Sequence, residues 1–399
     1  MDLPKPKRRS NRLLLKQNKE VAEDEPKNRF GCLPPEIAKD ILSRLPNVKS
    51  IFQSRSVCRS WELWSHDSHV FRMHFSRRSS TSSKLLYFYS SLQNELHFVE
   101  FSDINEKGLI ARKIENAFRD LTLRSFSVRS SSNGIMFLKD CFNFKRKCFY
   151  NPFTGDYKLV PEVDSGYYPL SYSYWAACHP VTQEYKVFAI RPVLGLTEFR
   201  SKAYVYSLSR NEWTRLGDFP FKVEDRSGNQ GVLVNGRLHC VTVKNKGKLT
   251  LLPNITSIDI MDYSVKEVPM PVEVIFRNSK RSQLVVLGEC LSVGVRRVDS
   301  RVHIWVMKTY GMESSWVKQY VFGSEFLKFD RNWRSHGDEM LRIVCLLNNE
   351  EILLAYDERE QGTLIAYNFV TKGYKTLTFG GTLPTTSCSA IFDSCCWSA

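Results

Sequence analysis

Cysteine and histidine are the residues of this chain whose chemistry could serve catalysis or metal binding. The chain has eleven cysteines and eight histidines. His239 and Cys240 are adjacent in a segment that reads as a strand, and adjacent strand residues point to opposite faces of a sheet. They therefore cannot form a thiolate–imidazole pair. We expect one of these side chains in the core and the other outside it.

The cysteines near the carboxyl terminus do not form a metal motif. Cys388, Cys395 and Cys396 lack the C-x-x-C pairing and the neighbouring histidines of zinc sites. The sequence also contains no GxGxxG, P-loop, G-x-S-x-G or H-E-x-x-H pattern. We expect no catalytic residue, no metal and no cofactor, so that the chain is not an enzyme and any chemistry is done by partners.

Composition indicates a globular protein whose thiols stay reduced. Apolar residues make up 42% of the 399 positions, in runs too short to span a membrane. The amino terminus has no apolar segment of a secretory signal, which favours the nucleus and/or cytoplasm. The net charge is +15, but the basic residues are scattered without a long stripe. We therefore expect a basic surface that suits an acidic partner or solubility, and we do not favour nucleic-acid binding.

The elements that would position a binding surface begin with short helices near the amino terminus. Pro34 and Pro35 can open a helix, and Pro46 ends it. Its apolar residues follow at i, i+4, i+5 and i+8 on one face: Ile37, Ile41, Leu42 and Leu45. A second helix with Ile51 and Phe52 inward and a third with Trp61 and Trp64 follow. Three such helices cannot bury all this apolar surface among themselves, so either the rest of the chain or a partner protein covers the remainder.

The run LPPEIAKDILSRLPNVKSIFQSRSVCRSW resembles an F-box, the module by which substrate receptors dock on a Skp-type adaptor and through it on a cullin. The matching positions are Leu33, Pro34, Glu36, Ile41, Leu42, Leu45, Pro46, Lys49, Ser50, Arg55, Val57, Cys58, Arg59 and Trp61. This resemblance implies that adaptor contact and helix packing fall on Leu33, Pro34, Ile37, Ile41, Leu42, Leu45, Val57, Cys58 and Trp61. The sequence does not divide these two roles among them.

The segments on either side of the F-box-like region (29–75) are polar. Residues 1–28 are too charged and too poor in apolar residues to fold alone, so we expect a disordered basic tail. In this tail Lys5, Lys7, Arg8 and Arg9 resemble a nuclear localisation signal, although a solvated basic tail explains them equally well. Residues 76–84 are rich in Ser and Arg, which indicates a linker.

From residue 85 the chain repeats a strand–turn–strand pattern. Aromatic or apolar residues that open a strand after a turn recur at intervals of 56, 52, 51 and 58 residues: Tyr157, Trp213, Val265, Trp316 and Tyr374. Four strands in each period of about 50 residues are typical of propeller blades. We predict an α+β multidomain protein with a three-helix F-box and a mainly antiparallel β-propeller of roughly six blades. Strand 389–392 would close the ring, and the alternative fold is an irregular β-sandwich.

Residues 85–399 also resemble the F-box-associated domain of plant F-box proteins, which is similar to kelch repeats. The stretches that carry this resemblance are SNGI at 132–135, YNPFTGDYK at 150–158 and HPVTQEYKV at 179–187. The resemblance implies a substrate-binding domain.

The combined reading is a substrate-recognition subunit of an SCF (Skp-cullin-F-box) ubiquitin ligase, in which a target protein is held for ubiquitination and degradation. For the target we single out Arg331, Trp333 and Arg334, because a tryptophan between arginines in a long loop has the composition of a binding hot spot. The alternative is that Trp333 is a core aromatic residue with the arginine side chains extended around it. The alternative is a nuclear protein-binding or RNA-associated scaffold that acts without a ligase. The identity of the target is not readable from the sequence.

Overall fold

The computed structural model describes residues 33–77, 85–90, 95–100, 104–105, 108–109, 112–114, 117–118, 121, 126–143, 145–163, 172–179, 181–182, 184–194, 199–223, 231–245, 251–271, 274, 282–297, 301–323, 341–358, 361–377 and 388–392. The chain divides into two compact units, the first ending at Val70 and the second beginning at Phe71. No helix among the described residues is long and apolar enough to cross a membrane.

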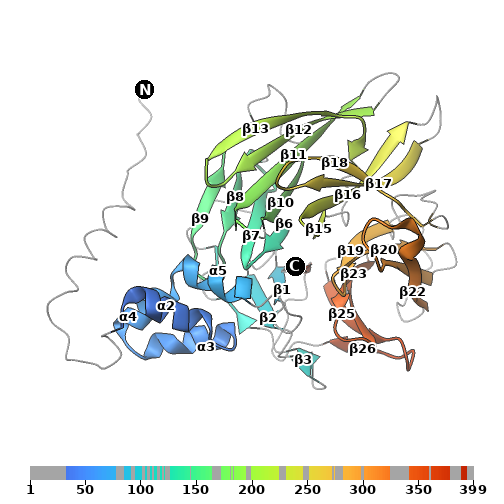
Figure 1. Cartoon of the computed structure of the whole chain (residues 1–399). Coiled ribbons are helices and arrows are strands. Elements are labelled where there is room, and N and C mark those ends of the chain that lie inside the picture. Colours follow the sequence, from blue (N-terminus) through green and yellow to red (C-terminus); the bar gives the residue numbers. More distant parts are fainter. Residues whose placement is uncertain are drawn as a thin grey trace. The chain divides into compact units, whose positions relative to one another are not determined.

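The amino-terminal part of the described chain is helical (Figure 1). It contains α2 (Pro35–Ser43), α3 (Val48–Gln53), the 3₁₀ turn η1 (Ser54–Ser56), α4 (Arg59–Ser65) and α5 (Ser68–Arg77). Pro35 occupies the first turn of α2, where a missing N–H costs no hydrogen bond. The side chain of Asn47 caps α3 by accepting a hydrogen bond from the Ser50 N–H at 2.7 Å.

The described F-box-like region has four α-helices, so our prediction of three was wrong. The break between α4 and α5 falls at Asp67, whose carboxylate accepts a hydrogen bond from the His69 N–H at 2.8 Å. An aspartate in this position begins a new helix because it satisfies one of the unpaired N–H groups of the first turn. The new helix α5 continues through Ser76 and Arg77, two residues that we had assigned to the linker. Residues 78–84 lie outside the described residues.

The second unit is a six-bladed β-propeller, and Figure 1 shows its sheets arranged in a ring. The strands of each blade are given in hydrogen-bonding order. Blade 1 has β27 (Cys388–Phe392), β1 (Leu85–Ser90), β2 (Glu95–Glu100) and β5 (Arg112–Lys113). Blade 2 has β6 (Phe126–Ser132), β7 (Ile135–Asp140), β8 (Lys147–Tyr150) and β9 (Tyr157–Val160). Blade 3 has β10 (Ser173–Cys178), β11 (Tyr185–Leu194), β12 (Phe199–Ser207) and β13 (Glu212–Phe219).

The remaining three blades follow the same order. Blade 4 has β14 (Lys222–Val223) and β15 (Val232–Val234), both paired with β16 (Arg237–Asn245), and then β17 (Leu251–Asp259) and β18 (Val265–Val268). Blade 5 has β19 (Ser282–Leu287), β20 (Cys290–Arg296), β21 (Arg301–Met307) and β22 (Trp316–Gly323). Blade 6 has β23 (Leu341–Leu346), β24 (Glu351–Glu358), β25 (Gln361–Asn368) and β26 (Tyr374–Leu377). The short hairpin of β3 (Ile104–Asn105) and β4 (Gly108–Leu109) lies between β2 and β5 in the sequence.

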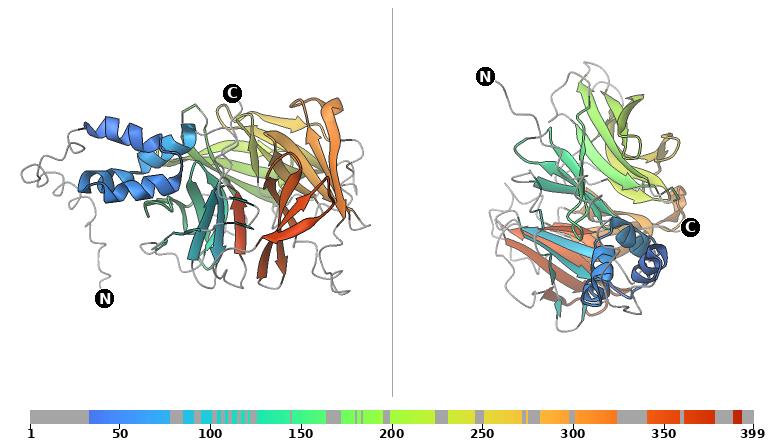
Figure 2. Two further views of the ribbon diagram at one scale, coloured as in Figure 1. Left: turned by 90° about the horizontal axis from the view of Figure 1, so that it is seen from below. Right: turned by 90° about the vertical axis from the view of Figure 1, so that its left-hand side faces the viewer.

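The propeller and its closing strand were both predicted from the sequence, and both predictions are confirmed. The five recurring residues lie at the starts of the fourth strands β9, β13, β18, β22 and β26. Strand β27 pairs antiparallel with β1, from Leu86 opposite Phe392 to Ser90 opposite Cys388. Figure 2 shows β27, in red, among the blue-green strands of the first blades. The alternative prediction of a β-sandwich is therefore wrong.

Two ends of the propeller can be distinguished because neighbouring strands in a blade run antiparallel. The turns that join first to second strands and third to fourth strands lie at one end, which we call the turn end. The connections from second to third strands lie at the opposite end, which we call the loop end. A residue's place in its blade therefore decides which of the two surfaces it belongs to.

Repeated contacts between blades explain the period of the sequence. The indole N–H of Trp213 in blade 3 donates to the Pro161 carbonyl of blade 2 at 2.9 Å. Trp316 in blade 5 donates in the same way to Pro269 of blade 4 at 2.8 Å. Each tryptophan thus links the outer strand of its own blade to the proline that follows the outer strand of the preceding blade. Consecutive residues of the repeat are therefore separated by the length of chain that forms one blade.

Aromatic residues in the turns between third and fourth strands form a second set of contacts between blades. Each lies against an aromatic or imidazole ring of the preceding blade. The ring centroids are 5.3 Å apart for Phe153–Phe98, 6.3 Å for Tyr263–Phe188, 5.5 Å for Tyr310–His239 and 4.3 Å for Phe369–Tyr320. Since each blade is covered by the next, the core of this unit is a series of layers between blades rather than one central cluster.

Candidate functional site

Helix α2 presents an apolar surface that its own unit does not cover. Ile37 and Ile41 are 50% and 37% exposed, and their i, i+4 spacing places them side by side on the helix. Ala38 and Leu42, on the other side of α2, are completely buried. The helix therefore contributes one face to the core of its unit and leaves a second apolar face to solvent. Surfaces of this kind mark sites of helix and partner binding.

The structure divides the predicted adaptor-contacting residues, which the sequence did not. Pro34, Ile37, Ile41 and Val57 are exposed, Leu33, Leu45, Cys58 and Trp61 are partly buried, and Leu42 is buried. Exposed residues are available to a partner, whereas Leu42 stabilises the unit itself. Leu63 in α4 is 55% exposed and was missed. It could have been found because Leu63 lies two residues after Trp61, which places it on roughly the opposite side of the helix.

Polar contacts fix the helices that carry this surface. The Lys39 ammonium of α2 lies 2.6 Å from the Asp67 carboxylate before α5. Burial would raise the pKa of Asp67, but the hydrogen bonds from Lys39 and from the His69 N–H outweigh it and lower that pKa. The Arg55 guanidinium lies 4.3 Å from the Phe52 ring centroid and donates to the Ser65 hydroxyl at 3.0 Å. A docking surface on these helices is therefore preorganised.

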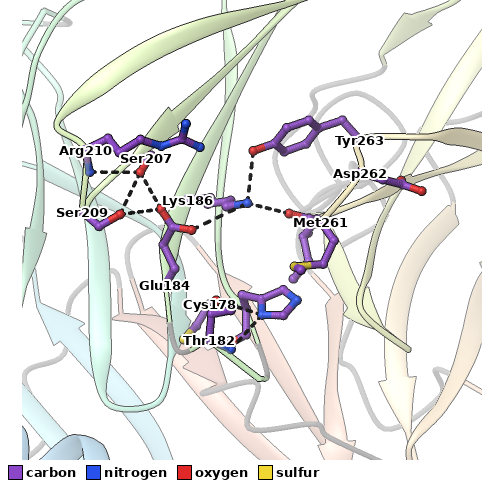
Figure 3. Close-up of polar contacts among 12 residues, drawn as sticks. Cys178, Thr182, Glu184, Lys186, Ser207, Ser209, Arg210, Met261, Asp262 and Tyr263 are labelled. Atoms are coloured by element: carbon purple, nitrogen blue, oxygen red, sulfur yellow. Dashed lines mark hydrogen bonds and ion pairs between the residues drawn. The ribbon is translucent and has the colours of Figure 1, made fainter.

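The propeller carries a network of polar side chains at the turn end, between blades 3 and 4 (Figure 3). Lys186 of β11 reaches across to blade 4, where its ammonium donates to the Ile260 carbonyl at 2.9 Å and to the Tyr263 hydroxyl at 3.1 Å. The Glu184 carboxylate lies 3.8 Å away. The Lys186 side chain is almost fully buried. A lysine buried in this way is stabilised by its partners and joins the two blades.

Glu184 is held from the other side by hydroxyl groups of its own blade. Its Oε1 accepts hydrogen bonds from Ser207 at 2.5 Å and from Ser209 at 2.7 Å. Partial burial raises the pKa of Glu184, but the two hydroxyls together with Lys186 have the larger effect and lower it. Glu184 is therefore a carboxylate at neutral pH, with its acceptor sites directed to groups of the protein. It is poorly suited to act as a general base.

His179 and Cys178 lie beside this network but do not form a nucleophile–base pair. The His179 Nδ1 accepts a hydrogen bond from the Thr182 N–H at 2.9 Å, and the Cys178 thiol is directed to the His179 carbonyl oxygen at 3.7 Å. Burial and nearby Lys186 lower the pKa of His179, so its ring is neutral. The geometry of the network supports a structural link between blades and not an active site.

The structure places both His239 and Cys240 in the interior, so our prediction that one would lie outside the core was wrong. Cys240 belongs to the hydrophobic cluster between blades 3 and 4, whereas His239 Nε2 lies 2.8 Å from the Tyr310 hydroxyl of blade 5. The two side chains do point to opposite faces of the sheet, but both faces are covered by neighbouring blades. Burial raises the pKa of Cys240 to about 12 and lowers that of His239 to about 4. Both groups are therefore neutral, and they do not interact.

Some of the candidate residues from the sequence are not among those the structure describes. The proposed target-binding residues Arg331, Trp333 and Arg334 and the basic cluster of Lys5, Lys7, Arg8 and Arg9 lie outside the described residues. In the described part of the chain, no group of three or more His, Cys, Asp or Glu side chains could hold a metal ion.

Comparisons with known proteins agree with the two kinds of unit. Residues 30–77 match the F-box-like family, and residues 90–385 match the F-box associated beta propeller domain. F-box protein At3g07870 of Arabidopsis thaliana is 33% identical over 385 residues, covering 88% of each chain. From the same organism, F-box protein At5g49610 is 26% identical over 72% of this chain and 78% of its own, and F-box protein CPR1 is 23% identical over 73% of each. The resemblances in the sequence are thereby confirmed: this chain belongs to the plant F-box proteins that carry an F-box-associated β-propeller domain.

Proposed function

We propose that this protein is the substrate-recognition subunit of an SCF ubiquitin ligase. Its F-box would bind a Skp-type adaptor, and its propeller would hold a target protein for ubiquitination and degradation. The observation that carries the proposal is the exposed apolar face of α2, in a module that belongs to the F-box family. The chain itself would do no catalysis, and its role would be to bring two proteins together.

The physical basis of this function is proximity. Holding a target and an activated ubiquitin carrier in one complex replaces a bimolecular encounter with a reaction inside the complex. This mechanism requires two independent binding surfaces on one chain and no reactive side chain. An F-box and a propeller, each with its own core, provide that arrangement.

The exposed apolar side chains of α2 supply affinity when a partner covers them. Full burial of an isoleucine contributes roughly 1.5–3 kcal/mol, and a carboxylate in its place would have to be desolvated. Substitution of Ile37 and Ile41 by Asp should therefore weaken adaptor binding by about a hundredfold or more. Binding of a purified Skp-type adaptor to the full chain by biolayer interferometry measures this effect.

The matched control puts two aspartates on exposed apolar residues of the propeller. Val181 and Val370 are both exposed in turns, so Val181→Asp with Val370→Asp makes the same change of charge at two exposed aliphatic residues. This control should bind the adaptor as the unchanged chain does, and circular dichroism should show both variants folded. Undiminished adaptor binding by the α2 variant would contradict the proposal. Failure of the unchanged chain to bind the adaptor would also contradict it, and that result is expected of a scaffold that acts outside a ligase.

A further inference from the structure

Among the described residues, basic side chains gather at the second-to-third strand connections of blades 2, 3 and 5, whereas the same connections of blades 1 and 6 carry Glu95 and the pair Asp357 and Glu358. At the loop end, the connection between β7 and β8 in blade 2 is flanked by Lys139, Lys145, Arg146 and Lys147, with Asp140 as the one acidic residue among those described there. The equivalent connection in blade 3 is flanked by Arg191, Arg200 and Lys202, and that of blade 5 by Arg296, Arg297 and Arg301.

The described residues of the turn end show no such excess of basic side chains. In blade 2 the turn between third and fourth strands combines Asp156 with Lys158, and in blade 3 Arg210 is followed by Glu212. In blade 5, Lys308 is followed by Glu313. Acidic and basic residues thus alternate at the turn end, whereas the described residues at the second-to-third strand connections of blades 2, 3 and 5 are predominantly basic.

The base of the blade 2 connection is fixed against blade 3. The Lys147 ammonium is fully buried, donates to the Lys145 carbonyl at 3.0 Å and lies 4.8 Å from the centroid of the Tyr174 ring of β10. The Lys139 ammonium lies 5.3 Å from the same centroid. Cation–π contacts of this length hold both lysines in place. The base of the blade 2 connection is therefore packed against β10 of blade 3, and its exposed basic residues, Lys145 and Arg146, project from a fixed base.

The tip of the same connection presents an aromatic ring to solvent. The Asp140 carboxylate accepts hydrogen bonds from the N–H groups of Phe142 and Asn143, each at 2.8 Å, and thereby orders the turn. Phe142 is 80% exposed, with Lys145 and Arg146 exposed beside it in the sequence. Lys145 pairs with Glu162 at 3.6 Å, a surface contact that a partner's carboxylate can replace at little cost.

We propose that the loop end of blades 2, 3 and 5 binds an acidic segment of the target protein, with Phe142 in contact with an apolar residue of that segment. This inference rests on the proposed function, and it names the chemistry of the target. Opposite charge accelerates encounter and fixes orientation, while a buried aromatic residue contributes affinity.

Nucleic acid is the other polyanion to consider, and the observations favour it less. Proteins that bind single strands stack successive bases on several aromatic rings. Besides Phe142, the large exposed aromatic residues in the described part of the chain are Tyr157 and Tyr374. Both begin fourth strands, next to the turn end. A row of stacking platforms is therefore not found among the described residues of the basic end.

The test uses the full chain and a fluorescein-labelled glutamate-rich peptide with one central leucine, measured by fluorescence anisotropy. One variant carries Lys145→Glu with Arg146→Glu, and a second carries Arg297→Glu with Arg301→Glu; all four residues are exposed. The matched control, Arg210→Glu with Lys372→Glu, reverses two exposed charges at the turn end. We expect each loop-end variant to weaken peptide binding about tenfold or more, the control to change it less than about twofold, and Phe142→Ser to weaken it severalfold.

Three results would overturn the inference: no peptide binding, an equal loss in the control, or tighter binding of single-stranded polyuridine RNA with the same sensitivity to the variants. Adaptor binding by the same preparations is measured in parallel. If adaptor binding is retained and the peptide results fail, this inference falls while the proposed function stands. If adaptor binding is absent and the peptide results hold, the ligase role falls and the acidic binding surface stands.

Discussion

At the scale of single residues, His239 shows how burial by two neighbouring blades decides the chemistry of a side chain. Its Nδ1 faces the Val232 carbonyl oxygen at 3.3 Å, so this nitrogen carries the proton. Nε2 then accepts the hydrogen bond from the Tyr310 hydroxyl at 2.8 Å. Burial disfavours the charged form of the ring and lowers the pKa to about 4, although the hydrogen bond to the Val232 carbonyl opposes this effect. The residue ties blade 4 to blade 5 and is not available as a base.

The pH dependence of stability should follow from this pKa. Between the unfolded value near 6.5 and the folded value of about 4, the unfolded chain binds a proton that the folded chain does not. The free energy of unfolding should therefore have its full value above pH 6.5 and fall by up to about 3 kcal/mol, through His239 alone, as the pH falls toward 4. Urea unfolding of the unchanged chain and of His239→Gln between about pH 7 and 5 measures it. We expect a shallower dependence in the variant, and parallel curves would refute this assignment.

At the scale of elements, the turn between third and fourth strands joins one blade to the next. In blade 2 the backbone of this turn is set by Asn151, whose side chain accepts a hydrogen bond from the Phe153 N–H at 3.0 Å, and by Gly155 at a φ of +78°. The turn directs Phe153 toward blade 1, where its ring lies 5.3 Å from that of Phe98 and 6.1 Å from that of Tyr87. A short sequence pattern thus produces a contact between segments about fifty residues apart.

Substitution of Phe153 tests whether the turn stabilises the contact with the neighbouring blade or only its own hairpin. Phe153→Ala removes ring contacts with Phe98 and Tyr87 of blade 1 and with Phe71 of α5, and it should reduce the free energy of unfolding by about 3–5 kcal/mol. Tyr157→Ala, in the same hairpin but 37% exposed, should cost no more than about 1 kcal/mol. Denaturant unfolding measures both. Equal losses in the two variants would mean that the turn stabilises its own hairpin and not the neighbouring blade.

At the scale of the whole propeller, the ring is closed by the two ends of its sequence. Strand β27 supplies the first strand of a blade whose other strands follow directly after the F-box, and it also contacts β6 and β23 of the neighbouring blades. Closure removes the exposed edge that β1 would otherwise present, and such edges promote aggregation. The stability of the amino-terminal blade therefore depends on residues about 300 positions later in the chain.

A truncation tests this closure. A chain that ends at residue 387 lacks β27, whereas a chain that ends at Phe392 keeps all of it. We expect the shorter chain to melt about 10 °C or more below the longer one, because several backbone hydrogen bonds and the cover of the β1 edge are lost. Differential scanning fluorimetry compares the two chains, and light scattering reports aggregation. Equal melting temperatures would show that the ring does not need its closing strand.

The helical F-box, the repeated blades and the closing strand were all predictable from the sequence, because these features depend on local periodicity and turn chemistry. Helix α2 was predictable from its prolines and apolar spacing. The exposure of Ile37 and Ile41 beside the buried Leu42 was not predictable, since it depends on how the other helices pack against α2. Likewise only the tertiary structure showed that both His239 and Cys240 are buried, because a middle strand of a propeller is covered on both faces.

The distribution of charge was decided in the same way. Along the sequence the basic residues are scattered, and the end of the ring at which each of them lies follows from the direction of the strand that it begins or ends. Lys139 and Arg200 are 61 positions apart in the sequence, yet both flank second-to-third strand connections of adjacent blades. Strand direction alternates within every blade, so only the assembled sheet sorts these residues onto one surface.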